Sequence, residues 1–171
     1  GKMDEFGDSI GGFIGNPLSS FMFQNVLDGK PWPLAPTIPL VLFALFQVKF
    51  AIIAPALVTG TFAERIKFKS YILFLVLFSL LIYSPLAHWT WHPDGFLFKW
   101  GVLDFAGGTV VHMSAGFAAL VASIYLRDKN EKKSTISPAN IPFVLLGTGL
   151  LWFGWFGFNA GSALSAGALA A

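Results

Sequence analysis

The sequence predicts an all-α protein, specifically a polytopic helix bundle in a membrane. Hydrophobic residues make up 55% of its 171 residues and charged residues only 12%, whereas a soluble domain usually carries about 25% charge. Nineteen Phe and six Trp residues give more apolar surface than a soluble fold of this size could bury. Four stretches also have the roughly 20 mostly apolar residues that a spanning helix needs. They cover residues 38–60, 70–87, 104–126 and 141–162.

The composition also excludes several kinds of function. The chain contains no Cys, which rules out disulfide frameworks, thiolate catalysis and Cys-based zinc sites. A net charge of +2, dispersed along the chain, does not fit nucleic-acid binding. We expect no metal, no cofactor and no enzymatic activity. The first residues, GKMDEFGD, are polar and acidic rather than a signal peptide, so we expect targeting information in the first span or outside this chain.

The segments between the predicted spans indicate which side of the membrane each one faces. Residues 1–37 are rich in Gly, Pro and Asn and predict an ordered loop with at most a short helix. Basic residues gather in 61–69 and 127–140, and cytoplasmic loops carry an excess of Lys and Arg. They are Arg65, Lys67 and Lys69 in the first segment, and Arg127, Lys129, Lys132 and Lys133 in the second. We therefore expect these two segments to be cytoplasmic, and residues 1–37 and 88–103 to lie outside.

Two ionisable residues lie in the third predicted span, where such groups are costly and invite a functional explanation. At 1.5 Å per residue, His112 lies roughly 12 Å below the start of this span at Asp104. Gly108 and Gly116 lie one turn to either side of His112. This pattern fits a histidine that lines a narrow passage, and equally a core histidine bonded to a neighbouring helix. Asp104 fits an ordinary helix N-cap and also a buried negative charge that favours a cation, and the two roles are compatible.

Aromatic and hydroxyl side chains gather at the outer level of the predicted bundle. Phe46 and Phe50 are four residues apart in the first span and share a helix face. Trp91 follows the second span, and Ser162 ends the fourth. Taken singly, they are typical of core or lipid contacts, of an interfacial anchor and of an ordinary helix-end hydroxyl. Together with Asp104, they predict a cation site formed by cation–π and hydrogen-bond attraction, with a phenylalanine constriction below it.

Five short segments are specific enough to compare with known families. They are FQVKF at 46–50, APALVTGTFAER at 54–65, AHWTW at 87–91, DFAGGTVVHMSAG at 104–116 and WFGFNAGS at 155–162. Each resembles a signature motif of the ammonium transporter (Amt/Mep/Rh) family, and of its Amt branch in particular. The resemblance follows the family's order and covers nearly the whole chain.

This resemblance implies a fold, a substrate and a set of residue roles. The fold would be an eleven-span bundle of two inverted five-helix halves with the pore between them, assembled as a homotrimer in the cell membrane. The substrate would be ammonium, deprotonated on its way through a hydrophobic pore, and a cytosolic regulatory protein would be a further partner. The implied roles are recruitment of ammonium for Phe50, Trp91 and Ser162, the gate for Phe46, Phe50 and Phe158, a structural and cation-favouring carboxylate for Asp104, and the first of two pore histidines for His112.

Two features depart from the family pattern. The second pore histidine normally lies on a late span that this chain does not contain. We therefore expect residues 1–171 to be a partial family domain that resembles spans three to six and does not enclose a pore alone. In addition, Lys49 stands beside the gate where an apolar residue is usual, and no role is assigned to it.

Several alternatives stay open beside an ammonium channel or transporter. Within the same fold they are an ammonium sensor and a Rh-type gas channel. A structural membrane subunit is a further alternative, because the GxxxG at 157–161 would allow close helix packing. An intramembrane hydrolase is disfavoured, since Ser162 and His112 differ in depth by about half the membrane core and a nucleophile must contact its base. No GxSxG motif precedes Ser162 either.

Overall fold

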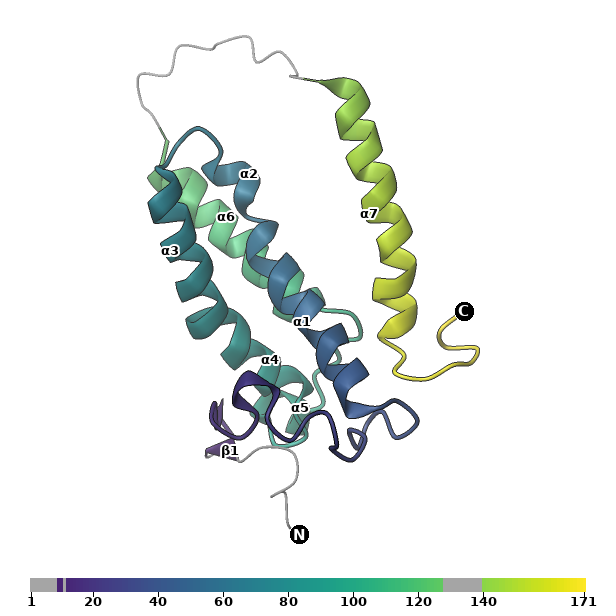
Figure 1. The fold of residues 1–171 in the computed structure, drawn as a ribbon. Helices are drawn as coiled ribbons and strands as arrows, with labels where there is room; N and C mark the ends of the chain where they lie inside the picture. The colour runs from purple at the N-terminus through teal and green to yellow at the C-terminus, as the bar shows by residue number, and fades with distance from the viewer. Residues whose placement is uncertain (1–8, 11, 128–139) are drawn as a thin grey trace.

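The computed structural model describes residues 9–10, 12–127 and 140–171, and it is a bundle of long helical segments that alternate in direction (Figure 1). Four of these segments are long and apolar enough to cross a membrane, so the predicted fold class is confirmed. They span Leu40–Phe62, Phe68–Lys99, Gly108–Tyr125 and Ile141–Gly161. The third starts four residues later than its sequence predicts, because Asp104 and the residues after it form a turn rather than helix.

One end of the bundle carries most of the irregular structure, and we call it the loop-rich end (the lower end in Figure 1). Here the short strands β1 (Ser9–Ile10) and β2 (Ile14–Gly15) form an antiparallel hairpin. A single 3-10 turn, η1, follows at Phe21–Phe23. The indole of Trp89 donates to the carbonyl of Phe13 (2.6 Å), which ties this loop to the second span.

The first span is α1 (Leu40–Ala56) followed after a short break by α2 (Thr59–Phe62). Pro55 lies in the last turn of α1, and a proline cannot donate the backbone hydrogen bond that continues a helix. The Thr59 hydroxyl then shares a hydrogen bond with the Tyr71 hydroxyl (2.6 Å). This contact joins the start of α2 to the second span.

The second span consists of α3 (Phe68–Phe78), the π-helical segment η2 (Ser79–Tyr83) and α4 (Ser84–Trp91), and it ends with the short helix α5 (Phe96–Lys99). The widened turn precedes Pro85, which lacks an N–H and removes one ordinary helical bond. The Ser84 backbone N–H and side-chain hydroxyl both donate to the carbonyl of Ser79 instead. The π segment is therefore the local response to a proline inside an otherwise continuous helix.

The third span begins with a second π-helical segment, η3 (Gly108–Met113), and continues as α6 (Ser114–Tyr125). The fourth span is the single helix α7 (Ile141–Gly161). Asn140 caps α7, because its side chain accepts from the Phe143 N–H (3.0 Å).

The packed core lies where α1, the second span and η3 meet. Its buried residues are Phe50, Ala54, Phe78, Tyr83, Val110 and Val111. By contrast, α7 buries none of its residues, and it stands apart from the other helices over most of its length (Figure 1). The fourth span therefore approaches the bundle mainly at its C-terminal end, near the loop-rich end.

Candidate functional site

A pocket of about 390 Å³ lies at the loop-rich end, and we call it the aromatic pocket. It collects side chains from α1, the end of α4, the segment before η3 and the end of α7. Five of the residues singled out in the sequence line it together: Phe46, Phe50, Trp91, Asp104 and Ser162. The structure thus brings together residues that lie up to 116 positions apart in the chain.

Phe50 is the centre of the aromatic contacts around this pocket. Only 2% of its surface is exposed. Its ring meets Phe46 edge-on (centroids 4.9 Å apart) and Trp91 edge-on (5.6 Å), and it lies 4.4 Å from the ring of Phe158. We call these four residues the aromatic cluster. Phe46 and Phe50 belong to the pocket wall, whereas Phe158 lies on the far side of Phe50, outside the pocket lining.

Trp91 is held in place by a hydrogen bond as well as by ring contacts. Its indole N–H donates to the backbone carbonyl of Asp104 (2.9 Å). This bond joins the end of α4 to the turn that precedes η3. The ring therefore presents a fixed aromatic surface to the pocket.

Asp104 uses both carboxylate oxygens to organise the start of the third span. Oδ1 accepts from the N–H groups of Gly107 (2.5 Å) and Gly108 (2.8 Å), and Oδ2 accepts from those of Thr109 (2.8 Å) and Val110 (3.0 Å). Four backbone donors at a helix start are thereby satisfied by one side chain. Two expectations need correction here: Asp104 precedes the helix by four residues rather than starting it, and it is half-buried rather than fully buried.

Gly107 allows this turn to form. Its φ of +92° lies in the left-handed region, which glycine adopts without steric cost. A Cβ at this position would also lie 2.7 Å from Cγ2 of Val111. The carbonyl of Gly107 accepts from both Val111 and His112 N–H groups (2.9 Å each), so the π-helical bonding pattern of η3 begins at this turn.

His112 faces α7 rather than an enclosed interior. Its imidazole stacks on the indole of Trp155 (centroids 5.7 Å apart, planes at 23°) and lies 6.2 Å from the ring of Phe158. Gly108 and Gly116 flank it as expected from the spacing, but all three residues are exposed in this chain. Within the described residues, α7 covers only one side of the ring, so His112 is not a core histidine enclosed by these four spans.

Ser162 ends α7 beside the pocket. Its hydroxyl donates to the carbonyl of Phe158 (2.8 Å), and the oxygen keeps lone pairs for accepting a hydrogen bond. One residue earlier, Gly161 lies so close to α1 that an added Cβ would be 2.6 Å from Cε2 of Phe46. The absence of a side chain at Gly161 thus permits the close approach of α7 to α1.

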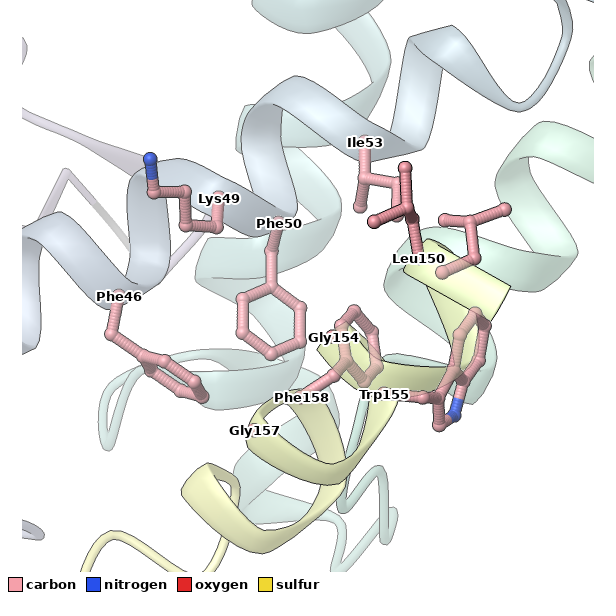
Figure 2. A pocket seen from close by; sticks show the side chains of 10 residues that line it. Phe46, Lys49, Phe50, Ile53, Leu150, Gly154, Trp155, Gly157 and Phe158 are labelled. Carbon is pink, nitrogen blue, oxygen red and sulfur yellow. The ribbon is translucent and has the colours of Figure 1, made fainter. Parts of the chain in front are cut away.

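A second cavity, of about 500 Å³, lies between α1 and α7 next to the aromatic cluster (Figure 2). Phe46, Phe50, Trp155 and Phe158 line it with aliphatic side chains of both helices. Lys49 lines its edge, and Figure 2 shows its amino group pointing away from the Phe50 ring. Lys49 is exposed, which agrees with a long side chain that carries its charge away from apolar surroundings.

Sequence reasoning missed two residues that the structure places at the site. Trp155 lies three positions before Phe158, so both share one face of α7, and this spacing could have linked Trp155 to the cluster. Thr90 lines the aromatic pocket with 2% of its surface exposed. Thr90 belongs to the AHWTW motif at 87–91, but the motif does not show that its side chain is buried, because that depends on how α4 packs against η3.

The fold and this site define a multi-pass membrane protein whose spans converge on the aromatic pocket and on the second cavity, between α1 and α7. The chain belongs to the Ammonium Transporter Family, whose model matches residues 5–171, so the resemblance in the sequence motifs is confirmed. It is 51% identical to an ammonium transporter of Aquifex aeolicus over 97% of this chain. Among solved structures, it is similar to Saccharomyces cerevisiae Mep2 (TM-score 0.81, 38% identity, 93% of this chain and 35% of that one). It is also similar to a structure described as a sensor Amt protein (TM-score 0.79, 37% identity, 96% of this chain and 42% of that one).

The chain matches only part of each of these relatives. It spans 38% of the length of the Aquifex aeolicus protein, or about two-fifths.

Proposed function

We propose that the protein is an ammonium transporter or channel of the cell membrane. It recruits ammonium at the aromatic pocket and passes ammonia, with or without the proton, along an apolar path lined by His112. The observation that carries this proposal is the convergence of Phe50, Trp91, Asp104 and Ser162 on one pocket. The name of the Aquifex aeolicus relative points to the same substrate.

The chemistry of the pocket suits a small cation. The faces of Phe50 and Trp91 attract cations through their ring quadrupoles, with about 0.5–2 kcal/mol for each contact. Ser162 supplies an oxygen that accepts a hydrogen bond. Both oxygens of the Asp104 carboxylate accept hydrogen bonds from backbone N–H groups, four in total. The negative charge of the carboxylate still attracts a nearby cation, because it is less screened there than in bulk water. Asp104 would therefore both shape the turn and favour the cation.

The residues beyond the pocket suit a step that removes the proton. Phe46, Phe50 and Phe158 would form the gate, because their rings crowd the route between the pocket and His112. An unpaired charge in such apolar surroundings is costly, whereas neutral ammonia crosses at much lower cost. His112, stacked against Trp155, would then guide ammonia and accept or relay the proton. No metal or cofactor is required by this scheme.

The orientation and assembly follow from the same proposal. The loop-rich end, with residues 1–37 and 88–103, would face outward, since the basic segments at 61–69 and 127–140 would be cytoplasmic. The protein would form a homotrimer, with a second pore histidine supplied by a later span. A cytosolic regulatory protein is a further proposed partner. An ammonium sensor remains the second candidate, because one structural neighbour is described as a sensor.

The test is transport by the protein expressed from its full reading frame and reconstituted in liposomes that contain a pH-sensitive dye. An ammonium gradient should change the internal pH faster than in empty vesicles. Trp91→Leu should raise the ammonium concentration at half-maximal rate about tenfold, because about 1.4 kcal/mol of cation attraction is lost. The matched control is Trp152→Leu, since Trp152 is 70% exposed on α7 and lines neither cavity. A parent protein no faster than empty vesicles would rule out transport and favour the sensor.

A further inference from the structure

One buried hydroxyl in the aromatic pocket stands out from the other helix hydroxyls. Thr90 lies in α4 and lines the pocket, and only 2% of its surface is exposed. Its Oγ1 is the one buried side-chain polar atom without a hydrogen-bond partner in residues 12–127 and 140–171. Buried polar groups are rarely left unpaired, and each exception calls for an explanation.

Several other hydroxyls in the helices of this chain are bonded to the backbone. Four of them donate to the carbonyl four residues earlier, which is the usual partner of a helical Ser or Thr. They are Ser114, Ser123, Thr148 and Ser162. Thr90 has a helical position that offers the same kind of partner, yet its hydroxyl does not use it. Its donor and its lone pairs are therefore unused within residues 12–127 and 140–171.

The pocket is short of groups that could accept hydrogen bonds from a cation. Both oxygens of Asp104 already accept two N–H groups each. The indole N–H of Trp91 is a donor and is already bonded. The hydroxyl oxygen of Ser162 keeps lone pairs, and Gln47 supplies the remaining side-chain acceptor in the lining besides Thr90. An ammonium ion carries four N–H donors, so an additional oxygen acceptor in this aromatic lining would matter.

We infer that the Thr90 hydroxyl is a specificity-determining group that accepts a hydrogen bond from ammonium in the aromatic pocket. This inference rests on the proposed function. The hydroxyl favours a cation with a full set of N–H donors over one in which a methyl group replaces a donor. Its lack of an internal partner leaves the oxygen unused while the pocket is empty. Because the oxygen is buried, the ion reaches it through a small movement of the pocket lining, and bulk water does not compete there.

The experiment compares ammonium with methylammonium in the reconstituted full-reading-frame protein. Thr90→Val keeps the shape of the side chain and removes the hydroxyl, so it should raise KM for ammonium about tenfold, the effect expected for one hydrogen bond to an ion. KM for methylammonium should change less, so the preference for ammonium falls. Thr90→Ser restores the hydroxyl and should restore the preference. Thr148→Val is the matched control, because that hydroxyl is exposed and bonded to Val144.

Each alternative outcome has a distinct meaning. If the parent protein moves ammonium and Thr90→Val has the parental KM for both ions, the inference is wrong and the proposed function stands. If KM rises equally for both ions, the hydroxyl orders the pocket or holds a water, and the direct contact is wrong. If the parent protein does not move ammonium, the proposed function fails first. The thermal midpoint of Thr90→Val should not fall, since the change removes an unpaired polar group, and a large fall would assign Thr90 a structural role instead.

Discussion

The first three spans and the fourth span are held in different ways. The first three share a core that includes Phe78, Tyr83 and Val110. Side-chain hydrogen bonds also tie the first span to the second (Thr59 to Tyr71) and the second span to the turn before the third (Trp91 to Asp104). The fourth, α7, buries no residue. Its ring contacts run from Trp155 and Phe158 to Phe50 and His112.

This difference places the candidate site at the joint between a packed unit and a weakly attached helix. Two of the residues that attach α7 to the bundle, Phe50 and Phe158, are also proposed to form part of the gate. Helix association in lipid depends on close packing and polar contacts rather than on the hydrophobic effect. The aromatic cluster would therefore both attach α7 and form part of the proposed site, and substitutions in α7 and in the first three spans should separate the two roles.

The largest effect is expected from Phe50→Ala compared with Phe78→Ala. Both rings are 2% exposed, so each variant should lower the free energy of unfolding by about 3 kcal/mol through loss of packing. Only Phe50 contacts α7. Hydrogen exchange in residues 141–161 should therefore accelerate in Phe50→Ala alone. Equal exchange in the two variants would show that α7 is attached by other contacts.

Asp104→Asn should destabilise the packed first three spans without loosening the attachment of α7. On sequence grounds, Asn would cap a helix about as well as Asp, so a loss of transport would report on charge alone. The structure corrects that view, because the amide has one acceptor oxygen and would turn its NH₂ toward two backbone donors. We expect a loss of about 2 kcal/mol in unfolding free energy, measured by denaturation in detergent. The control is Asp94→Asn, whose ion pair with Lys99 (3.2 Å) is partly exposed and should matter by less than about 1 kcal/mol.

Gly161→Ala should test the contact between α7 and α1 by a change in α7. The new Cβ would lie 2.6 Å from the Phe46 ring, so the ring or the helix must shift, at about 1–2 kcal/mol. We expect a lower thermal midpoint and faster exchange at the end of α7. At Gly154, nothing lies within 4 Å of an added Cβ, so Gly154→Ala should not reproduce this loss. A parental midpoint for Gly161→Ala would mean that Phe46 moves aside freely.

The smallest effect is expected at the far end of α7. Asn140→Ala removes the bond from the Phe143 N–H to the Asn140 side chain, and loss of such a cap costs about 1 kcal/mol. The first turn of α7 should fray, which faster exchange in residues 141–145 would report. Asn140→Asp keeps the cap and is the matched control. If exchange also became faster as far as Phe158, the whole of α7 would open as one cooperative unit. That result would contradict a helix that is attached mainly at its C-terminal end.

Much of the fold could be predicted without coordinates. Long apolar stretches must form helices in lipid, because every backbone N–H and C=O needs an internal partner there. The four spans follow from that constraint, as does the fold class. The motifs around Phe50, Trp91, Asp104 and Ser162 also identified the family and selected residues that share one pocket.

Other features depend on which groups meet in three dimensions, and the sequence by itself does not determine them. The four N–H groups around the Asp104 carboxylate require the left-handed turn at Gly107, and the two π segments depend on how local bonds are redistributed. The exposure of His112 depends on how far α7 leans from the bundle. The unpaired hydroxyl of Thr90 depends on the packing of α4 against η3. Hydrophobic pattern fixes which segments enter the membrane, whereas the partners of individual polar groups are decided only when the helices pack.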